Sequence, residues 1–177
     1  CMGSYDNTTD KMEYDGIIGC AAAAQLAGGI TSCRFGCMGL GDCMKACQYD
    51  AITVCNGVAS INPEKCKGCG QCVAACPKGL ISFVPLKKQA VVRCANCDKG
   101  AATTKVCKVG CIGCTLCAKK CPAEAITITN NLASIDYSKC TGCGTCATVC
   151  PRKLIVNLDA PKAEPAAPAA PAAQPAQ

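Results

Sequence analysis

The sequence lacks several residues on which common protein chemistry depends. Its 177 residues include no His and no Trp, and only 2 Phe and 4 Tyr. Without His there is no Cys2His2 zinc finger, no Rieske centre and no Ser-His or Cys-His nucleophile. With so few aromatic residues, a hydrophobic core of ordinary size is not expected, so another factor must help to stabilise the fold.

The chain also lacks a long apolar run. The longest such stretch, residues 21–30, is interrupted by Gln25 and by two glycines, and it falls short of the roughly 20 residues that a membrane-spanning helix requires. No signal peptide is visible. Because the sequence begins at Cys1 and not at Met, we expect it to be the soluble portion of a longer chain.

Cysteine, in contrast, is abundant, with 22 residues. Three runs follow the pattern C-x2-C-x2-C-x3-C-P and begin at Cys66, Cys111 and Cys140. This run is typical of bacterial ferredoxins that hold two [4Fe-4S] clusters. Zinc sites use C-x2-C pairs that lie farther apart, and thiols crowded this closely are poorly placed for disulfides. The runs therefore predict [4Fe-4S] binding, and no zinc is expected.

The two halves of the chain are related by a shift of about 74 positions, as from Cys66 to Cys140. One exception stands out, because Leu40 lies where the second half has Cys114. Cys33 is the nearest thiol that could replace the missing ligand, and Cys20 is the next. The alternative is that this motif has lost its cluster. Each half is thus expected to be one unit of about 70 residues with two cluster motifs.

The predicted fold class is α+β, with two tandem bacterial-type 2x[4Fe-4S] ferredoxin-like domains built from short strands and helices. Strands are expected at 16–19, 51–54, 58–61, 80–84, 90–93, 125–128, 132–135 and 154–156, and helices at 43–47, 72–76, 117–121 and 146–150. The predicted division is a loop or remnant at 1–15, domain 1 at 16–86, domain 2 at 90–158, and a disordered Ala/Pro-rich tail at 159–177, with 87–89 as the joining segment.

In two-cluster ferredoxins, the first three Cys of one motif share a cluster with the fourth Cys of the other motif. Applied to each half, this scheme gives four ligand sets: Cys66, Cys69, Cys72 and Cys47; Cys37, Cys43, Cys76 and Cys33; Cys111, Cys114, Cys117 and Cys150; and Cys140, Cys143, Cys146 and Cys121. Six thiols remain: Cys1, Cys20, Cys55, Cys94, Cys97 and Cys107. They are either small buried residues, or Cys94, Cys97 and Cys107 hold a further metal centre, such as a fifth cluster, with Cys20 or Cys1 as the fourth ligand.

Two segments carry a resemblance to a known family. The sequence MEYDGIIGC at 12–20 and the sequence CRFGCMGLGDC at 33–43 resemble the B subunit of the Rnf-type ion-translocating ferredoxin:NAD oxidoreductase, in its longer, anaerobe-type form. The resemblance covers residues 1 to about 158. It implies a place at the cytoplasmic face of the cell membrane, with an anchor outside this sequence. It also implies ferredoxin or flavodoxin as the electron donor, and membrane and flavin subunits as partners.

The residue pattern by itself indicates a conductor of electrons. Closely spaced one-electron centres, with no base and no substrate pocket pattern, describe electron transfer without a catalytic site in this chain. The alternatives are a free polyferredoxin, or the cluster subunit of a hydrogenase, formate dehydrogenase or carbon monoxide dehydrogenase. Four clusters with their thiolates add about −8 to the formal charge of +6, which leaves the loaded protein slightly acidic. Binding to nucleic acid is therefore not expected.

Overall fold

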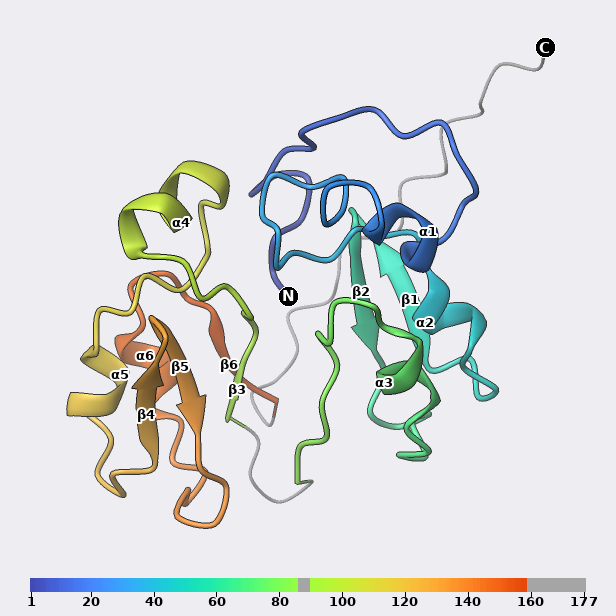
Figure 1. The fold of residues 1–177 in the computed structure, drawn as a ribbon. Helices are drawn as coiled ribbons and strands as arrows, with labels where there is room; N and C mark the ends of the chain where they lie inside the picture. Colours follow the sequence, from blue (N-terminus) through green and yellow to red (C-terminus); the bar gives the residue numbers. More distant parts are fainter. Residues whose placement is uncertain (86–89, 159–177) are drawn as a thin grey trace.

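The computed structural model describes residues 1–85 and 90–158. Two units lie side by side, with a long N-terminal segment over the first of them (Figure 1). The first unit contains α1 (Cys20–Ala24), α2 (Asp42–Lys45), β1 (Ile52–Cys55), β2 (Val58–Ile61) and α3 (Gln71–Ala75). The second contains β3 (Ala90–Val92), α4 (Gly100–Val106), α5 (Leu116–Lys119), β4 (Ile126–Thr129), β5 (Leu132–Ile135), α6 (Thr145–Val149) and β6 (Ile155–Asn157).

Each unit contains one hairpin of identical register. β1 pairs with β2 so that Cys55 lies opposite Val58, and β4 pairs with β5 in the same antiparallel manner. The two-residue turns require positive φ, which Asn56 and Gly57 adopt at 50° and 75°. Asn and Gly tolerate this conformation best, and turns of this type match the twist of the strands. Both predicted hairpins are therefore confirmed to within one residue.

The remaining two-stranded sheet is found in the second unit, where β3 pairs with β6. The matching strands predicted at 16–19 and 80–84 are wrong, because the structure describes both segments as irregular. Ala90 and Ile155 are buried in the core of the second unit, whereas Ile17 is 81% and Phe83 65% exposed. Apolar side chains that find no partner surface do not hold a strand in place.

The residues before Cys20 lead instead into a helix that the sequence did not predict. The backbone amide of Ala21 donates to a carboxylate oxygen of Asp42 at 2.9 Å, and Lys45 donates to the carbonyl of Ile18 at 3.1 Å. These bonds hold the beginning of α1 against α2, which carries Cys43. Helix α4 was not predicted either. The four helices expected beside the cluster motifs are present, displaced by one or two residues.

Two small apolar clusters stabilise the units. The cluster of the second unit is centred on Leu154, Ile155 and Ile126, together with three buried Cys residues. In the first unit, Ala23, Ile30 and Met38 form a smaller cluster. The cores are thin, as the shortage of aromatic residues predicts. Within the described part of the chain, no helix has the length and apolar character needed to cross a membrane.

The N-terminal segment connects the two units. Thr8 forms an isolated antiparallel bridge with Cys107, and its hydroxyl donates to the carbonyl of Val106 at 2.8 Å. Arg34 and Asp98 form an ion pair across the same junction at 2.7 Å. Residues expected to be a loose remnant thus pack against the second unit. The predicted linker 87–89 and the predicted tail 159–177 lie outside the described residues.

Candidate iron-sulfur centres

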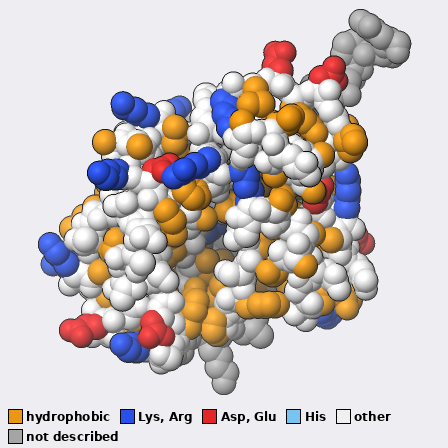
Figure 2. Space-filling view, viewed as in Figure 1, with side chains coloured by type: hydrophobic (Ala, Val, Ile, Leu, Met, Phe, Trp, Pro, Cys, Tyr) orange, Lys and Arg blue, Asp and Glu red, His pale blue; other side chains and the backbone are white. Residues whose placement is uncertain are grey.

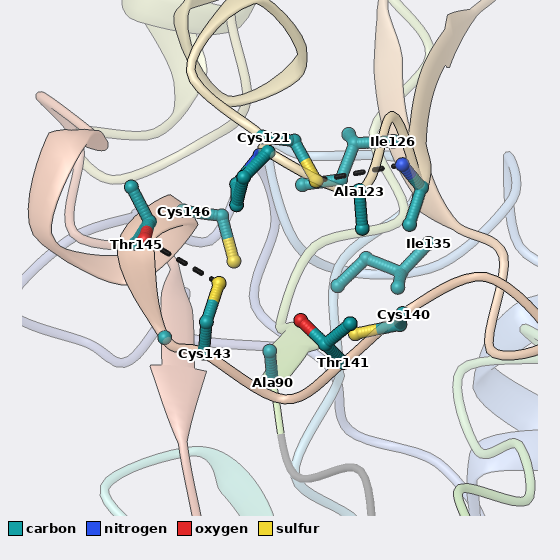
Figure 3. A pocket seen from close by; sticks show the side chains of 13 residues that line it. Ala90, Cys121, Ala123, Ile126, Ile135, Cys140, Thr141, Cys143, Thr145 and Cys146 are labelled. Atoms are coloured by element: carbon teal, nitrogen blue, oxygen red, sulfur yellow. Dashed lines mark hydrogen bonds between the residues drawn. The ribbon is translucent and has the colours of Figure 1, made fainter.

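One cavity of the second unit is surrounded by four thiols from two different motifs. Cys140, Cys143 and Cys146 come from the last motif, and Cys121 comes from the preceding one. Figure 3 shows their sulfurs around the same space, with apolar side chains such as Ile126 closing it. The structure therefore brings together one complete ligand set expected from the cross-ligation scheme.

A second cavity in this unit has the same composition. It is lined by Cys111, Cys114 and Cys117 from one motif and by Cys150 from the other. The two cavities are of nearly equal size, about 320 and about 340 Å³ when the part open to solvent is included. Two equivalent cavities, each with three thiols from one motif and one from the other, fit a pair of cubane clusters.

Residues with a left-handed backbone conformation immediately precede the helices that carry these thiols. Thr115 precedes α5 with φ 63°, and Gly144 precedes α6 with φ 75°. An ideal Cβ on Gly144 would approach the Asn157 side chain to 3.0 Å, so a larger residue would be both strained and crowded there. These sharp turns direct Cys117 and Cys146 from the first turn of each helix into the cavities.

Burial favours the protonated form of Cys117 and Cys146 until a metal binds. Burial raises the pKa of Cys117 to about 11, and nearby Cys111 and Cys114 act in the same direction. Burial also raises the pKa of Cys146. Cationic iron would reverse this preference, because bound metal stabilises the thiolate and displaces the proton. Thiols grouped in fours, without a carboxylate among the lining residues, fit an iron–sulfur centre.

Backbone amides already point at several of the sulfurs. Ala125 donates to Cys121 Sγ, and Gly142 to Cys140 Sγ, each at 3.4 Å. In the first unit, Leu80 donates to Cys76 Sγ at the same distance. Hydrogen bonds of this kind lower the electron density on ligand sulfur and so adjust the reduction potential of a cluster.

The first unit groups its thiols in a similar way. Burial raises the pKa of Cys72, and interactions with Cys66 and Cys47 add to the effect. Cys47 thus lies with the thiols of the following motif, as the cross-ligation scheme expects. Cys69 belongs to the same loop and is exposed.

A thiol other than the expected Cys33 lies near the motif that contains Leu40. Burial raises the pKa of Cys43 to about 11, and Cys37, Cys20 and Cys76 reinforce this shift. Cys20 and Leu40 both pack against the apolar cluster of this unit. The structure therefore favours Cys20 over Cys33 as the fourth ligand beside Cys37, Cys43 and Cys76. Spacing could not reveal this, because Cys20 is brought to α2 by helix α1.

Cys33 lies at the junction of the two units. Its sulfur accepts a hydrogen bond from the side chain of Asn96 at 3.4 Å. Two other thiols outside the ligand sets are separate from it: Cys55 is exposed on β1, and Cys97 donates to the carbonyl of Ala95. Among the described residues, no three Cys, Asp or Glu side chains surround a single metal ion. Cubane ligands do not need to, because each thiolate binds a different iron.

Family comparisons agree with this chemistry. A 4Fe-4S dicluster domain matches residues 110–154, and a 4Fe-4S binding domain matches residues 59–82. The chain is therefore an iron–sulfur electron-transfer protein with two 4Fe-4S ferredoxin-type domains, and its motifs account for four [4Fe-4S] clusters.

Curated relatives narrow the class further. The chain is 41% identical over 140 residues to the B subunit of the Na(+)-translocating ferredoxin:NAD(+) oxidoreductase complex of Acetobacterium woodii. It is 42% identical over 140 residues to the B subunit of the ion-translocating oxidoreductase complex of Methanosarcina acetivorans. It is 44% identical over 139 residues to the B subunit of the proton-translocating ferredoxin:NAD(+) oxidoreductase complex of Clostridium ljungdahlii. Each match covers 78% of this chain.

These matches confirm the resemblance, and by sequence the chain belongs to the family of Rnf complex B subunits. The matched region corresponds to 42%, 53% and 49% of the three relatives, so the chain spans about half of their length.

Proposed function

We propose that this chain passes electrons singly from a reduced ferredoxin or flavodoxin toward the other subunits of an ion-translocating, NAD-reducing complex at the cytoplasmic face of a membrane. The observation that carries this proposal is the pair of four-thiol cavities in the second unit. When bound, [4Fe-4S] clusters supply low-potential one-electron transfer. The membrane and flavin subunits would be the partners that accept the electrons.

The residues of the chain would have three tasks in this role. Thiolates hold each cluster in four positions, so that no open coordination site remains for a substrate. Backbone amides such as those of Ala125 and Gly142 adjust the potentials. Apolar side chains around the cavities, including Leu154 and Ile155, keep water from the buried sulfurs.

We propose the following ligand sets. The second unit uses Cys111, Cys114, Cys117 and Cys150 for one cluster, and Cys140, Cys143, Cys146 and Cys121 for the other. The first unit uses Cys66, Cys69, Cys72 and Cys47 for one, and Cys37, Cys43, Cys76 and Cys20 for the other. The domain plan of two tandem units, residues 16–86 and 90–158, belongs to the same proposal.

A free polyferredoxin, or the cluster subunit of another dehydrogenase or a hydrogenase, is less well supported. Identity of 41–44% across 78% of the chain extends well beyond the cluster motifs. A general ferredoxin likeness would be restricted to the cluster motifs.

The experiment is anaerobic rapid mixing of the chain with reduced ferredoxin, followed by the bleaching of the iron–sulfur absorbance. We expect bleaching that reflects about one electron per cluster, and transfer onward when the other subunits are added. Absence of bleaching by ferredoxin and by flavodoxin, with full bleaching by dithionite, would contradict the donor. Full reduction without onward transfer would contradict the place in the complex.

A further inference from the structure

Arg152 lines one of the two four-thiol cavities of the second unit, the cavity of Cys111 and Cys150. It lies two residues after Cys150 and is half-buried. The other cavity has Ala123 at the matching place, two residues after its fourth thiol, Cys121. None of the described residues that line this other cavity is Lys, Arg, Asp or Glu. The two cavities therefore differ by one positive charge.

Three hydrogen bonds fix the guanidinium of Arg152. Its Nε donates to the carbonyl of Gly110 at 3.3 Å. Its Nη2 donates to the carbonyl of Cys107 at 3.2 Å and to the hydroxyl of Thr104 at 3.3 Å. All three acceptors are uncharged, and no carboxylate in the described part of the chain pairs with this arginine. The side chain is thus held in position without losing its charge to a partner.

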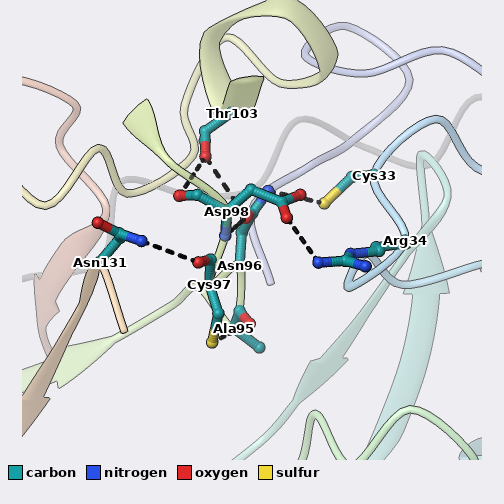
Figure 4. Close-up of polar contacts among 8 residues, drawn as sticks. All are labelled: Cys33, Arg34, Ala95, Asn96, Cys97, Asp98, Thr103 and Asn131. Carbon is teal, nitrogen blue, oxygen red and sulfur yellow. Dashed lines mark hydrogen bonds and ion pairs between the residues drawn. The ribbon is translucent and has the colours of Figure 1, made fainter. Parts of the chain in front are cut away.

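Arg34 shows the contrasting case. Its guanidinium pairs with the carboxylate of Asp98 at 2.7 Å, and 67% of its side chain is exposed (Figure 4). A carboxylate partner offsets most of the charge that a neighbouring group experiences, and water and salt screen the remainder. Arg152 is bonded to neutral oxygens and is half-buried, so its field on the adjacent cavity is offset far less.

The first unit has a cation at the same place in its repeat. Lys78 lies two residues after Cys76, and the shift of 74 positions aligns it with the arginine of the second unit. Its ammonium donates to the carbonyls of Gly28 and Arg34, so it also binds backbone oxygens. In the other motif of the first unit, the matching residue is Tyr49. Each unit therefore has a cation beside one ligand set and none at the matching place of the other.

We propose that Arg152 and Lys78 determine the order of reduction within each unit, because each raises the reduction potential of the cluster beside it above that of the other cluster. Reduction adds a negative charge to a cluster that its thiolates already make anionic. A fixed cation nearby therefore stabilises the reduced form more than the oxidised form, and more strongly where water is excluded.

The step that these cations bias is the transfer of one electron between the two cubanes of a unit. One cluster is oxidised and the other reduced, and no bond or proton changes place. Electrons collect on the cluster of Cys111 and Cys150 in the second unit, and on the cluster that includes Cys76 in the first. This inference rests on the proposed function, since it requires the clusters to be bound.

Redox titration of the anaerobically purified chain with chemical mediators, followed by EPR, tests the assignment. Cys114→Ala removes a ligand of the cluster beside Arg152 and so identifies its signal. Arg152→Gln should shift the electron equilibrium between the two second-unit clusters about tenfold away from this cluster, which corresponds to about 59 mV for one electron. Lys153→Gln is the matched control, because Lys153 is the adjacent cation, is exposed and lines neither cavity. It should shift the equilibrium less than about twofold.

Arg152→Lys separates charge from hydrogen bonding, because an ammonium keeps the positive charge but cannot reproduce the planar fork of donors. It should retain the potential of the unchanged protein. An unchanged potential in Arg152→Gln would overturn the proposal. So would equal shifts in Arg152→Gln and Lys153→Gln, or equal shifts in Arg152→Gln and Arg152→Lys.

If Arg152→Gln binds too little iron for a titration, Lys78→Gln decides. It should lower the potential of the first-unit cluster that includes Cys76, and an unchanged potential would overturn the proposal. None of these results affects the proposed function, because the mediators take the place of ferredoxin in the titration. An unchanged chain that binds no iron after anaerobic reconstitution would overturn the proposed function and this inference together.

Discussion

The proposed ligation by Cys20 leads to a sharp prediction. Asp42 and Lys45 of α2 bind the backbone at the beginning of α1, which places Cys20 near Cys43. Cys20→Ala should remove one of the four ligands of a single cubane, so the iron content should fall by about four per chain. The other clusters, held by separate ligand sets, should remain.

A second change should reverse this loss. Leu40 occupies the position of Cys114 in the repeat, so Leu40→Cys in the Cys20→Ala background rebuilds a regular C-x2-C-x2-C-x3-C motif. Iron should return to the level of the unchanged chain. The substitution removes part of an apolar side chain from the small cluster around Met38, and we expect it to lower the free energy of unfolding by about 1–2 kcal/mol.

The assay is anaerobic iron and sulfide determination, with EPR of the reduced proteins to identify the missing cluster. Cys55→Ala is the control, because this exposed thiol on β1 belongs to no ligand set. The reasoning would be refuted if Cys20→Ala kept all of its iron while Leu40→Cys restored a Cys33→Ala protein. That result would return Cys33 to the first unit as the fourth ligand.

Three further predictions concern stability and docking. Leu154 is only 2% exposed, so Leu154→Ala should lower the free energy of unfolding by about 2–5 kcal/mol in anaerobic denaturant titration. An equal decrease for Leu158→Ala, at an exposed side chain, would contradict this prediction. Asp98→Asn breaks an ion pair whose Arg34 partner is 67% exposed. It should therefore lower the free energy of unfolding by less than about 1 kcal/mol in the same titration. A larger decrease would mean that this ion pair contributes more to stability than its exposure indicates. Lys65 and Lys67 are both exposed, and the double change Lys65→Glu with Lys67→Glu should slow reduction by an acidic ferredoxin in rapid mixing. The rate should also depend less on salt concentration. If Lys119→Glu with Lys120→Glu slowed reduction equally, Lys65 and Lys67 would not define the docking site.

Positive charge does not gather in a single docking patch on the face of the molecule shown in Figure 2. On the face shown in Figure 2, Lys and Arg side chains are spread over the surface and do not form one continuous area. Arg34 is engaged with Asp98, and Lys108 donates to the carbonyl of Asp6 at 3.0 Å. Some of the positive charge near the cluster loops therefore holds the two units together, and is not all available to an acidic donor.

Features encoded by local sequence were predictable. The hairpin turns follow from Asn56-Gly57 and from two Asn residues in the second unit, since these residue types adopt positive φ readily. The four helices that carry motif thiols follow from the cluster spacing. The two second-unit ligand sets also match the lining of the two cavities, because the cross-ligation rule fixes which motif supplies the fourth thiol.

Features that depend on contacts distant in sequence were not predictable. The strands expected at 16–19 and 80–84 have apolar residues, but only their counterparts in the second unit pair with each other. The approach of Cys20 to Cys43 depends on a bond from the Ala21 backbone to Asp42. The placement of Cys33 beside Asn96 requires the N-terminal segment to cross to the second unit. No local pattern indicates any of these contacts.

The crossing of the N-terminal segment has a consequence for biosynthesis. Thr8 and Arg34 find their partners at Cys107 and Asp98, which leave the ribosome long after the segment itself. At translation rates of roughly 5–20 residues per second, the delay is on the order of 3–20 s. During that time Cys33 lacks the surface that buries it in the finished protein. Its thiol therefore depends on a reducing environment until the second unit is complete.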